Sequence, residues 1–226
     1  MRIVALLGFV STGVASAVTY QLDDGTGESG LGGFGSETIF LNSFTSAAGG
    51  EYINQISIAF GSNIGGGMPS DYNGRPIMLH VWSDPNDDGV PDDAVLETSQ
   101  ADVISNFTAT DGAATATVFV DFPLLSSVYI PAGERFFVGV QTYDAASVYA
   151  PARDETSSQN NSWIYRWFGA TPGAAGMMSA APSKQNYNDT FGGNALIRAT
   201  GAAIPEPGLL GLFALGGFAL GLRRRR

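Results

Sequence analysis

The chain has 226 residues, with 11 Lys and Arg against 21 Asp and Glu, so its formal net charge is −10. It contains no cysteine and a single histidine. These counts exclude disulfides, thiol nucleophiles and thiolate metal sites, and they make nucleic acid a poor partner.

The first 17 residues have the pattern of a secretory signal peptide. Arg2 supplies the positive start, residues 3–10 are apolar, and Ala15-Ser16-Ala17 forms a small-residue cleavage site. The alternative is a buried strand or helix of the folded domain. With signal segments assigned to both ends, one domain of ordinary size remains at residues 18–203. It holds 6 basic and 20 acidic residues, a net charge of −14.

Short β-rich runs separated by Gly, Asn, Asp, Ser and Pro fill this domain. They predict strands at 38–44, 52–60, 76–82, 115–122, 135–143, 162–168 and 194–200, with weaker candidates at 18–22, 95–99 and 127–130. Residues 25–35 and 171–184 are expected to be loops. The predicted fold is therefore all-β, an antiparallel β-sandwich of jelly-roll type.

The loop after the predicted strand 76–82 has a D-x-N-x-D-G pattern, which resembles the first half of a calcium-binding loop. Gly89 permits the sharp turn that brings alternate oxygens together. The predicted ligands are Asp84, Asn86, Asp88, the carbonyl of Val90, Asp92 and Asp93. Position 12 is Val95 instead of a bidentate Glu, so the last ligand must come from Asp93, Glu97 or a distant residue. We expect structural calcium here; the alternative is an acidic turn without metal.

A row of aromatic residues follows in the predicted strand 162–168. Trp163, Tyr165 and Trp167 share one face of such a strand, and rings in a row can stack against sugars. Ile164 and Phe168 make the opposite face apolar as well, which favours core packing over glycan binding.

The sequence offers little support for catalysis. His80 has no second imidazole for a zinc site, and a Ser-His-Asp triad finds no further support. Two carboxylates suffice for glycoside hydrolysis, so Asp154 with Glu155, or Asp121 with Asp144, remain candidates by residue type. Among twenty acids, however, such pairs arise by chance. We therefore expect a protein that is not an enzyme.

The C-terminal end has three parts in order. Pro205-Glu206-Pro207 comes first, residues 208–222 are uncharged and mostly apolar, and Arg223, Arg224, Arg225 and Arg226 close the chain. As a helix, 208–222 spans about 22 Å against a hydrocarbon core of about 30 Å, which suits a temporary transmembrane anchor. The arginines keep the C-terminus on the cytoplasmic side. A simple tail anchor is the alternative.

This tail, residues 204–226, resembles the PEP-CTERM sorting domain of Gram-negative bacteria. The resemblance implies processing by an exosortase, an inner-membrane-anchored precursor and a mature form at the cell surface or outside the cell, often beside exopolysaccharide. We therefore expect an exported, non-catalytic surface or matrix protein associated with exopolysaccharide or biofilm. The alternative is a carbohydrate-binding module or, less favoured, a glycoside hydrolase.

Overall fold

The computed structural model describes residues 17–30, 37–61, 71–107, 117–142, 149–167 and 183–203. Residues 1–16 of the predicted signal peptide and the predicted tail at 204–226 lie outside these ranges. Within the ranges, no helix has both the length and the apolar character needed to cross a bilayer. Apart from Ala17, the described residues belong to the predicted β domain.

The larger sheet contains six strands, and each strand is antiparallel to its neighbours. In spatial order they are β11 (Ser183–Asn186), β10 (Ser162–Trp167), β3 (Glu37–Thr45), β8 (Arg135–Thr142), β5 (Pro76–Ser83) and β6 (Val95–Val103). Strand β6 is thus one edge of this sheet. A 3-10 turn, Pro91–Asp93, lies in the connection between β5 and β6.

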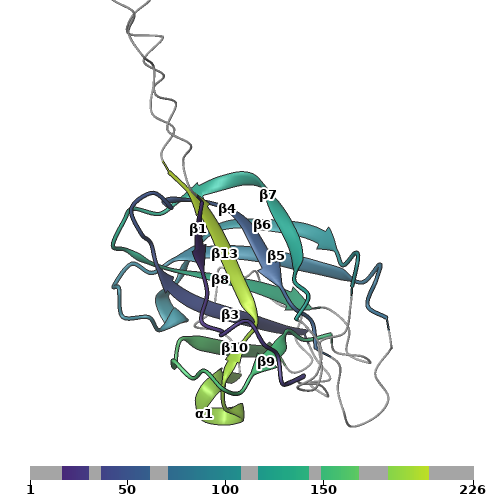
Figure 1. The fold of residues 1–226 in the computed structure, drawn as a ribbon. Coiled ribbons are helices and arrows are strands. Elements are labelled where there is room, and N and C mark those ends of the chain that lie inside the picture. The colour runs from purple at the N-terminus through teal and green to yellow at the C-terminus, as the bar shows by residue number, and fades with distance from the viewer. Residues whose placement is uncertain are drawn as a thin grey trace, which may run out of the picture.

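The second sheet contains four antiparallel strands (Figure 1). Their order is β1 (Val18–Tyr20), β13 (Ile197–Ala202), β4 (Tyr52–Ile58) and β7 (Val120–Tyr129). A small third sheet is formed by β12 (Asn194–Ala195), β9 (Ala152–Asp154) and β2 (Ser29–Gly30). The helix α1 (Tyr187–Phe191) begins after Asn186, whose side chain accepts a hydrogen bond from the N–H of Asp189.

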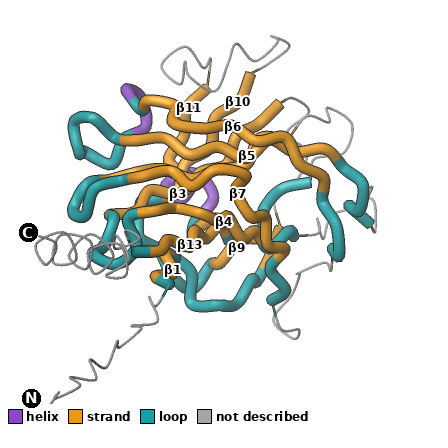
Figure 2. Tube along the Cα trace, turned by 90° about the horizontal axis from the view of Figure 1, so that it is seen from above, coloured by secondary structure: helices purple, strands orange, loops and turns teal. Residues whose placement is uncertain are grey.

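The main hydrophobic core lies between the two large sheets, which Figure 2 shows as two layers of strands. Strand β5 illustrates the alternation that produces it, because Ile77, Leu79 and Val81 are buried in this core. From the opposite sheet, Ile53 and Ile56 of β4 enter the same cluster. A small third cluster consists of Ala59, Ala152 and Leu196, with Phe119 packed against it.

A second apolar cluster covers the outer face of the six-stranded sheet. It contains Ile39 and Leu41 of β3, Trp82, Phe137 and Tyr165, and Ala94 from the β5–β6 connection packs onto it. The central strands are therefore apolar on both faces. The connection that carries the predicted calcium loop lies against this cluster.

The all-β class with antiparallel sheets is confirmed, whereas several boundaries differ from the prediction. The segments predicted at 115–122 and 127–130 meet in one strand, β7, which starts at Val120. Pro123 and the Ser126-Ser127 pair suggested a break, but pairing with β4 resumes beyond a bulge. The short strands β2, β9 and β11 were not predicted, because segments of two to four residues carry no periodic signal.

Candidate functional site

The D-x-N-x-D-G loop is shaped by its own side chains. At the end of β5, Asp84 accepts hydrogen bonds from the N–H groups of Asp87 (3.2 Å) and Gly89 (2.8 Å). The side chain of Asn86 accepts from the N–H of Asp88 at 3.0 Å, and Asp88 accepts from Val90 at 2.7 Å. Each of these side chains therefore accepts a hydrogen bond from a backbone N–H two to five residues further along the chain, and these bonds fix the turn of the loop.

Backbone geometry explains the glycine of this loop. Gly89 has a φ of 77° and Asp87 a φ of 59°, both in the left-handed region. A Cβ atom at Gly89 would lie 2.7 Å from the Arg135 guanidinium, which covers the loop. The backbone N–H of Arg135 also donates to the Asp87 carboxylate at 3.1 Å, and the two side chains form an ion pair at 3.6 Å. The loop is thus tied to the start of β8.

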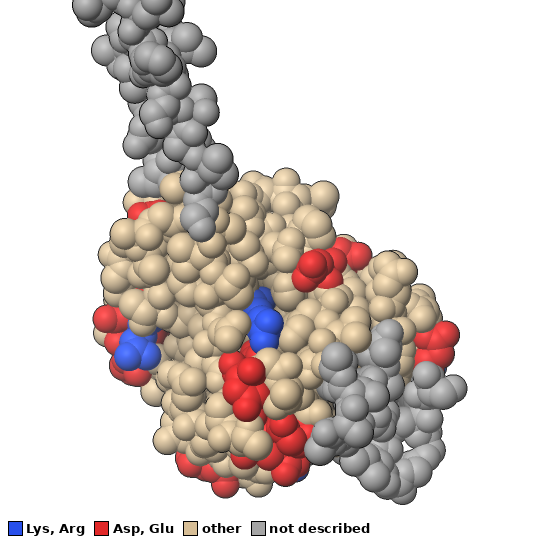
Figure 3. All heavy atoms as spheres, viewed as in Figure 1, with Lys and Arg blue, Asp and Glu red and all other residues tan. Residues whose placement is uncertain are grey.

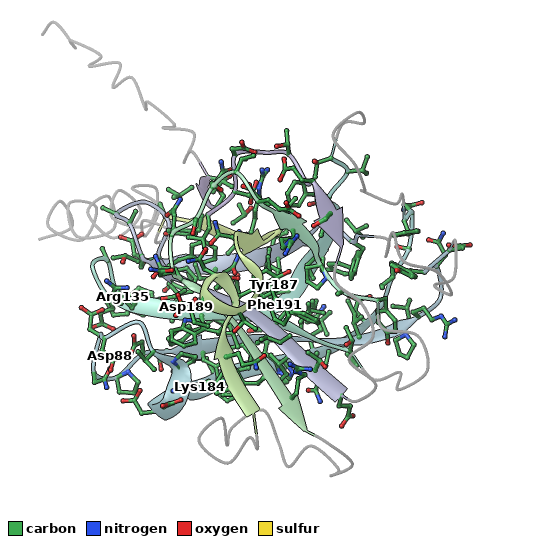
Figure 4. The ribbon with its side chains drawn as sticks, turned by 90° about the horizontal axis from the view of Figure 1, so that it is seen from below. Asp88, Arg135, Lys184, Tyr187, Asp189 and Phe191 are labelled. Atoms are coloured by element: carbon green, nitrogen blue, oxygen red, sulfur yellow. The ribbon has the colours of Figure 1, made fainter. Side chains whose placement is uncertain are left out.

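Three carboxylates of this loop converge. Asp84, Asp88 and Asp93 each offer an oxygen, and these oxygens all lie within 4.8 Å of one another. Burial raises the pKa of the Asp84 carboxyl, and the charges of Asp88 and Asp93 act in the same direction, although the N–H of Gly89 opposes them. Oxygen ligands of this kind suit a hard divalent cation. Figure 4 shows Asp88 and Arg135 together on one side of the domain.

The other predicted metal ligands have different surroundings. The Asp92 carboxylate accepts from the Tyr165 hydroxyl at 3.0 Å and pairs with Lys184. The amide of Asn86 donates to Asp88 at 3.1 Å, so this side chain contacts one of the three acids. Of the candidates for a final ligand, the structure brings Asp93 to the other acids, while Glu97 accepts from Ser83.

The predicted aromatic row lies largely inside the second apolar cluster. Tyr165 is fully buried, and burial together with the charge of Asp92 raises the pKa of its hydroxyl. Trp163 is half-buried, packs at the edge of the cluster and has the Lys184 ammonium 5.7 Å from its ring centroid. The side chain of Trp167 lies outside the described residues. Tyr165 is therefore a core residue and offers no surface to a sugar.

A second group of acids was not predicted. Asp24, Glu28 and Asp154 also bring carboxylate oxygens within 4.8 Å of one another. They come from distant parts of the sequence, which is why spacing alone gave no signal. Acidic side chains gather on the lower part of the face in Figure 3, near β9 and α1.

Protein donors already surround Asp154. Its carboxylate accepts hydrogen bonds from the N–H groups of Asp24 (2.9 Å), Thr156 (2.8 Å) and Ser157 (2.9 Å), and from the Ser157 hydroxyl. Burial acts to raise the pKa of Asp154, but these hydrogen bonds outweigh it and the pKa is lowered. The anion is therefore stabilised by the chain itself.

His80 is 2% exposed on the outer face of β5. Its Nε2 lies 3.0 Å from Oε1 of Gln141, so Nε2 carries the proton, and Nδ1 accepts from the Ser99 hydroxyl at 2.7 Å. Burial lowers the pKa of His80 to about 4, although the bond to Gln141 opposes this shift. A histidine of such low basicity is a poor general base near neutral pH.

The comparisons with known proteins concern the C-terminal end. Beyond Ala202, the last residue of β13, residues 203–226 match the family described as the PEP-CTERM protein-sorting motif. The tail is a PEP-CTERM motif. The resemblance of Pro205-Glu206-Pro207 and the four terminal arginines to this motif is thus confirmed, and the motif marks an exported, exosortase-sorted protein. Neither the curated proteins nor the solved structures gave a match to the chain.

Proposed function

We propose that the chain is a precursor whose β domain is displayed at the cell surface after exosortase removes the tail. The PEP-CTERM motif at 203–226 carries this proposal. The first and last strands add a geometric argument, because Val18 of β1 pairs with Gly201 of β13. Both predicted signals therefore leave the domain at one end, and residues 203–207 span at most about 18 Å before the apolar run begins.

Fractionation of producing cells tests this proposal. The full chain should be recovered outside the inner membrane without residues 1–17 and without the apolar run. Glu206→Ala should accumulate in the inner membrane with its tail intact, whereas Leu212→Ile, which keeps the hydropathy of the run, should be processed normally. An unprocessed chain in the cytosol would contradict the proposal.

We further infer that the displayed domain is a jelly roll that acts by binding and not by catalysis. The strand order supports the topology, because β1-β13-β4-β7 lies against β3-β8-β5-β6. Followed along the chain, these eight strands pass from one sheet to the other at every step except from β5 to β6, as in the two Greek keys of a jelly roll. Against catalysis stand the low basicity of His80 and the hydrogen bonds that engage Asp154. The proposed role is a matrix or surface protein associated with exopolysaccharide; a carbohydrate-binding module is the second candidate.

We also propose structural calcium at Asp84, Asp88 and Asp93. Burial, and then the charges of Asp88 and Asp93, raise the pKa of Asp84, and a divalent cation among the three carboxylates would offset both costs of keeping them ionised. Val90 follows Gly89 and can add its carbonyl oxygen. A bound ion would hold the connection that covers the second apolar cluster, so its expected effect is on stability.

Calorimetric titration and thermal unfolding of residues 18–203 test the calcium proposal. At a free calcium concentration 100 times Kd, the free energy of unfolding should rise by about 2.7 kcal/mol. Asp84→Asn should abolish this gain. Asp87→Asn is the matched control, since Asp87 lies in the same loop but pairs with Arg135. Equal loss in both variants would contradict the assignment, and loss in Asp92→Asn alone would move the site to Asp92.

A further inference from the structure

A groove lies between β6 and β7, which are edge strands of the two large sheets. It has a volume of about 320 Å³ and is lined by Glu97, Thr98, Ser126, Ser127, Val128 and Tyr129. We propose that this groove binds a neutral polysaccharide chain. The inference rests on the proposed surface function and gives that function a ligand class and a site.

The groove owes its shape to a large bulge in β7. Ile53 of β4 pairs with Val128 and Gln55 pairs with Pro123, so the single residue Asn54 faces the four residues 124–127. Bulges re-aim side chains and recur beside functional sites. Here the bulge brings Ser126 and Ser127 to the groove and leaves Leu125 92% exposed.

One side chain of β6 holds the bulge in place. The amide of Gln100 donates to the carbonyl of Pro123 at 3.0 Å and accepts from the N–H of Leu125 at 2.7 Å. Gln100 thus bonds to β7 as a neighbouring strand would. The two walls are fixed before a ligand arrives, which lowers the entropic cost of binding.

The groove offers hydroxyl groups that the fold does not use. Thr98, Ser126 and Ser127 line the groove, and their hydroxyls make no hydrogen bond within the described part of the chain. Each is both a donor and an acceptor, as are the hydroxyls of a sugar. Glu97 adds a carboxylate acceptor that one hydrogen bond from Ser83 leaves partly available.

An exposed aromatic residue lines the same groove. Tyr129 is 48% exposed, and its ring centroid lies 5.2 Å from that of Tyr52 on the neighbouring strand. The Tyr52 ring restricts its motion. A fixed, exposed aromatic ring can stack on the C–H face of a sugar while its hydroxyl remains in water. The ring that fits this role is therefore Tyr129 and not the buried Tyr165.

Charge and size select the ligand class. The domain carries −14 and Glu97 lies in the groove, so an anionic chain would be repelled. The volume is at the low end of the range for small-ligand sites and suits one or two sugar rings. A stable protein interface needs about 800 Å² on each partner, far more than one tyrosine and a few hydroxyls provide.

The test uses the full chain in mild detergent and the exopolysaccharide of the producing cells, divided by anion exchange into neutral and anionic fractions. Binding to each immobilised fraction is measured by interferometry. We expect binding to the neutral fraction, at least tenfold weaker for Tyr129→Ala and little changed for Tyr129→Phe, which keeps the ring. Val103→Ala, an equally exposed apolar residue outside the groove, and Trp163→Phe serve as controls.

Three results would overturn the inference: no binding to the neutral fraction, preference for the anionic fraction, or equal weakening by Trp163→Phe and Tyr129→Ala. Self-association in sedimentation velocity that Leu125→Ser abolishes, without glycan binding, would instead assign the groove to a protein interface. Cell fractionation tests the surface function separately. If the chain is exported and processed but the groove binds no glycan, this inference fails while the proposed surface function remains.

Discussion

Acidification to pH 5 should destabilise the domain through His80, the only histidine of the chain. In the folded state its ring is buried beside Trp82, with centroids 5.0 Å apart, and it bonds to Ser99 and Gln141. Protonating Nδ1 would break the hydrogen bond that it accepts from Ser99 and would bury a charge with no carboxylate bonded to the ring. The neutral form is therefore the folded form.

The size of the effect follows from the two pKa values. The pKa is about 4 in the folded chain and 6.5 when the ring is in water. Between these values the unfolded chain binds more protons, so stability is full above pH 6.5 and falls with pH down to about 4. The expected loss is about 2 kcal/mol between pH 7 and pH 5, and about 3 kcal/mol by pH 4.

Urea unfolding of residues 18–203 measures this loss, with His80→Gln as the comparison. Glutamine keeps a donor and an acceptor but does not titrate, so the variant should be less stable at pH 7 and lose about 2 kcal/mol less than the parent on going to pH 5. The carboxylates titrate in both proteins and cancel in the difference. NMR of the single imidazole gives the folded pKa directly. Equal losses in the two proteins, or a folded pKa near 6.5, would refute the reasoning.

Three further substitutions test the hydrogen bonds of Asp154 and Asp92 and the packing at the end of β13. Asp154→Asn places an amide NH₂ among the donors that the carboxylate now satisfies and should cost about 2–3 kcal/mol in denaturant unfolding; the exposed Glu155→Gln should change little. Tyr165→Phe removes the hydroxyl that donates to the Asp92 carboxylate and should cost about 1.5–3 kcal/mol, against less than about 0.5 for Tyr129→Phe; equal costs would contradict the described packing. Gly201→Ala puts a Cβ 2.0 Å from the carbonyl oxygen of Gly50 and should lower Tm, with hydrogen exchange fastest in β1 and β13.

The strands that could be predicted are those in which alternation is visible over seven or more residues. Residues 76–82 fall within β5, whose Ile77, Leu79 and Val81 alternate into the main core, and residues 38–44 fall within β3, which is apolar on both faces through Phe40 and Phe44 on one and Ile39 and Leu41 on the other. The bulge of β7 was read as a break, since Pro123 and the serine pair look like turn residues. What holds that strand together is Gln100 on β6, a contact between segments that no local pattern records.

The candidate site was predictable to the extent that it is local. Spacing placed Asp84 and Asp88 together because the hydrogen bonds that turn the loop run between residues two to five apart. Spacing also suggested Asp92 as a ligand, but the structure directs this carboxylate to Tyr165 and Lys184, which lie 73 and 92 residues further on. Asp24 and Glu28 come from the start of the domain, and Asp154 lies 130 residues beyond Asp24, so only the tertiary fold could bring them together.

One short connection thereby joins the two features that the sequence presented separately. Asp84, Asp88 and Asp93 gather on one side of it, while Asp92 and Ala94 contact the cluster that contains Tyr165. A cation at the three acids would therefore oppose any motion that uncovers Tyr165 and Trp82. Calcium should slow hydrogen exchange in β10 as well as in the loop, while exchange in β7, on the other sheet, should stay unchanged. If exchange slowed only within the loop, the ion and the outer cluster would be independent.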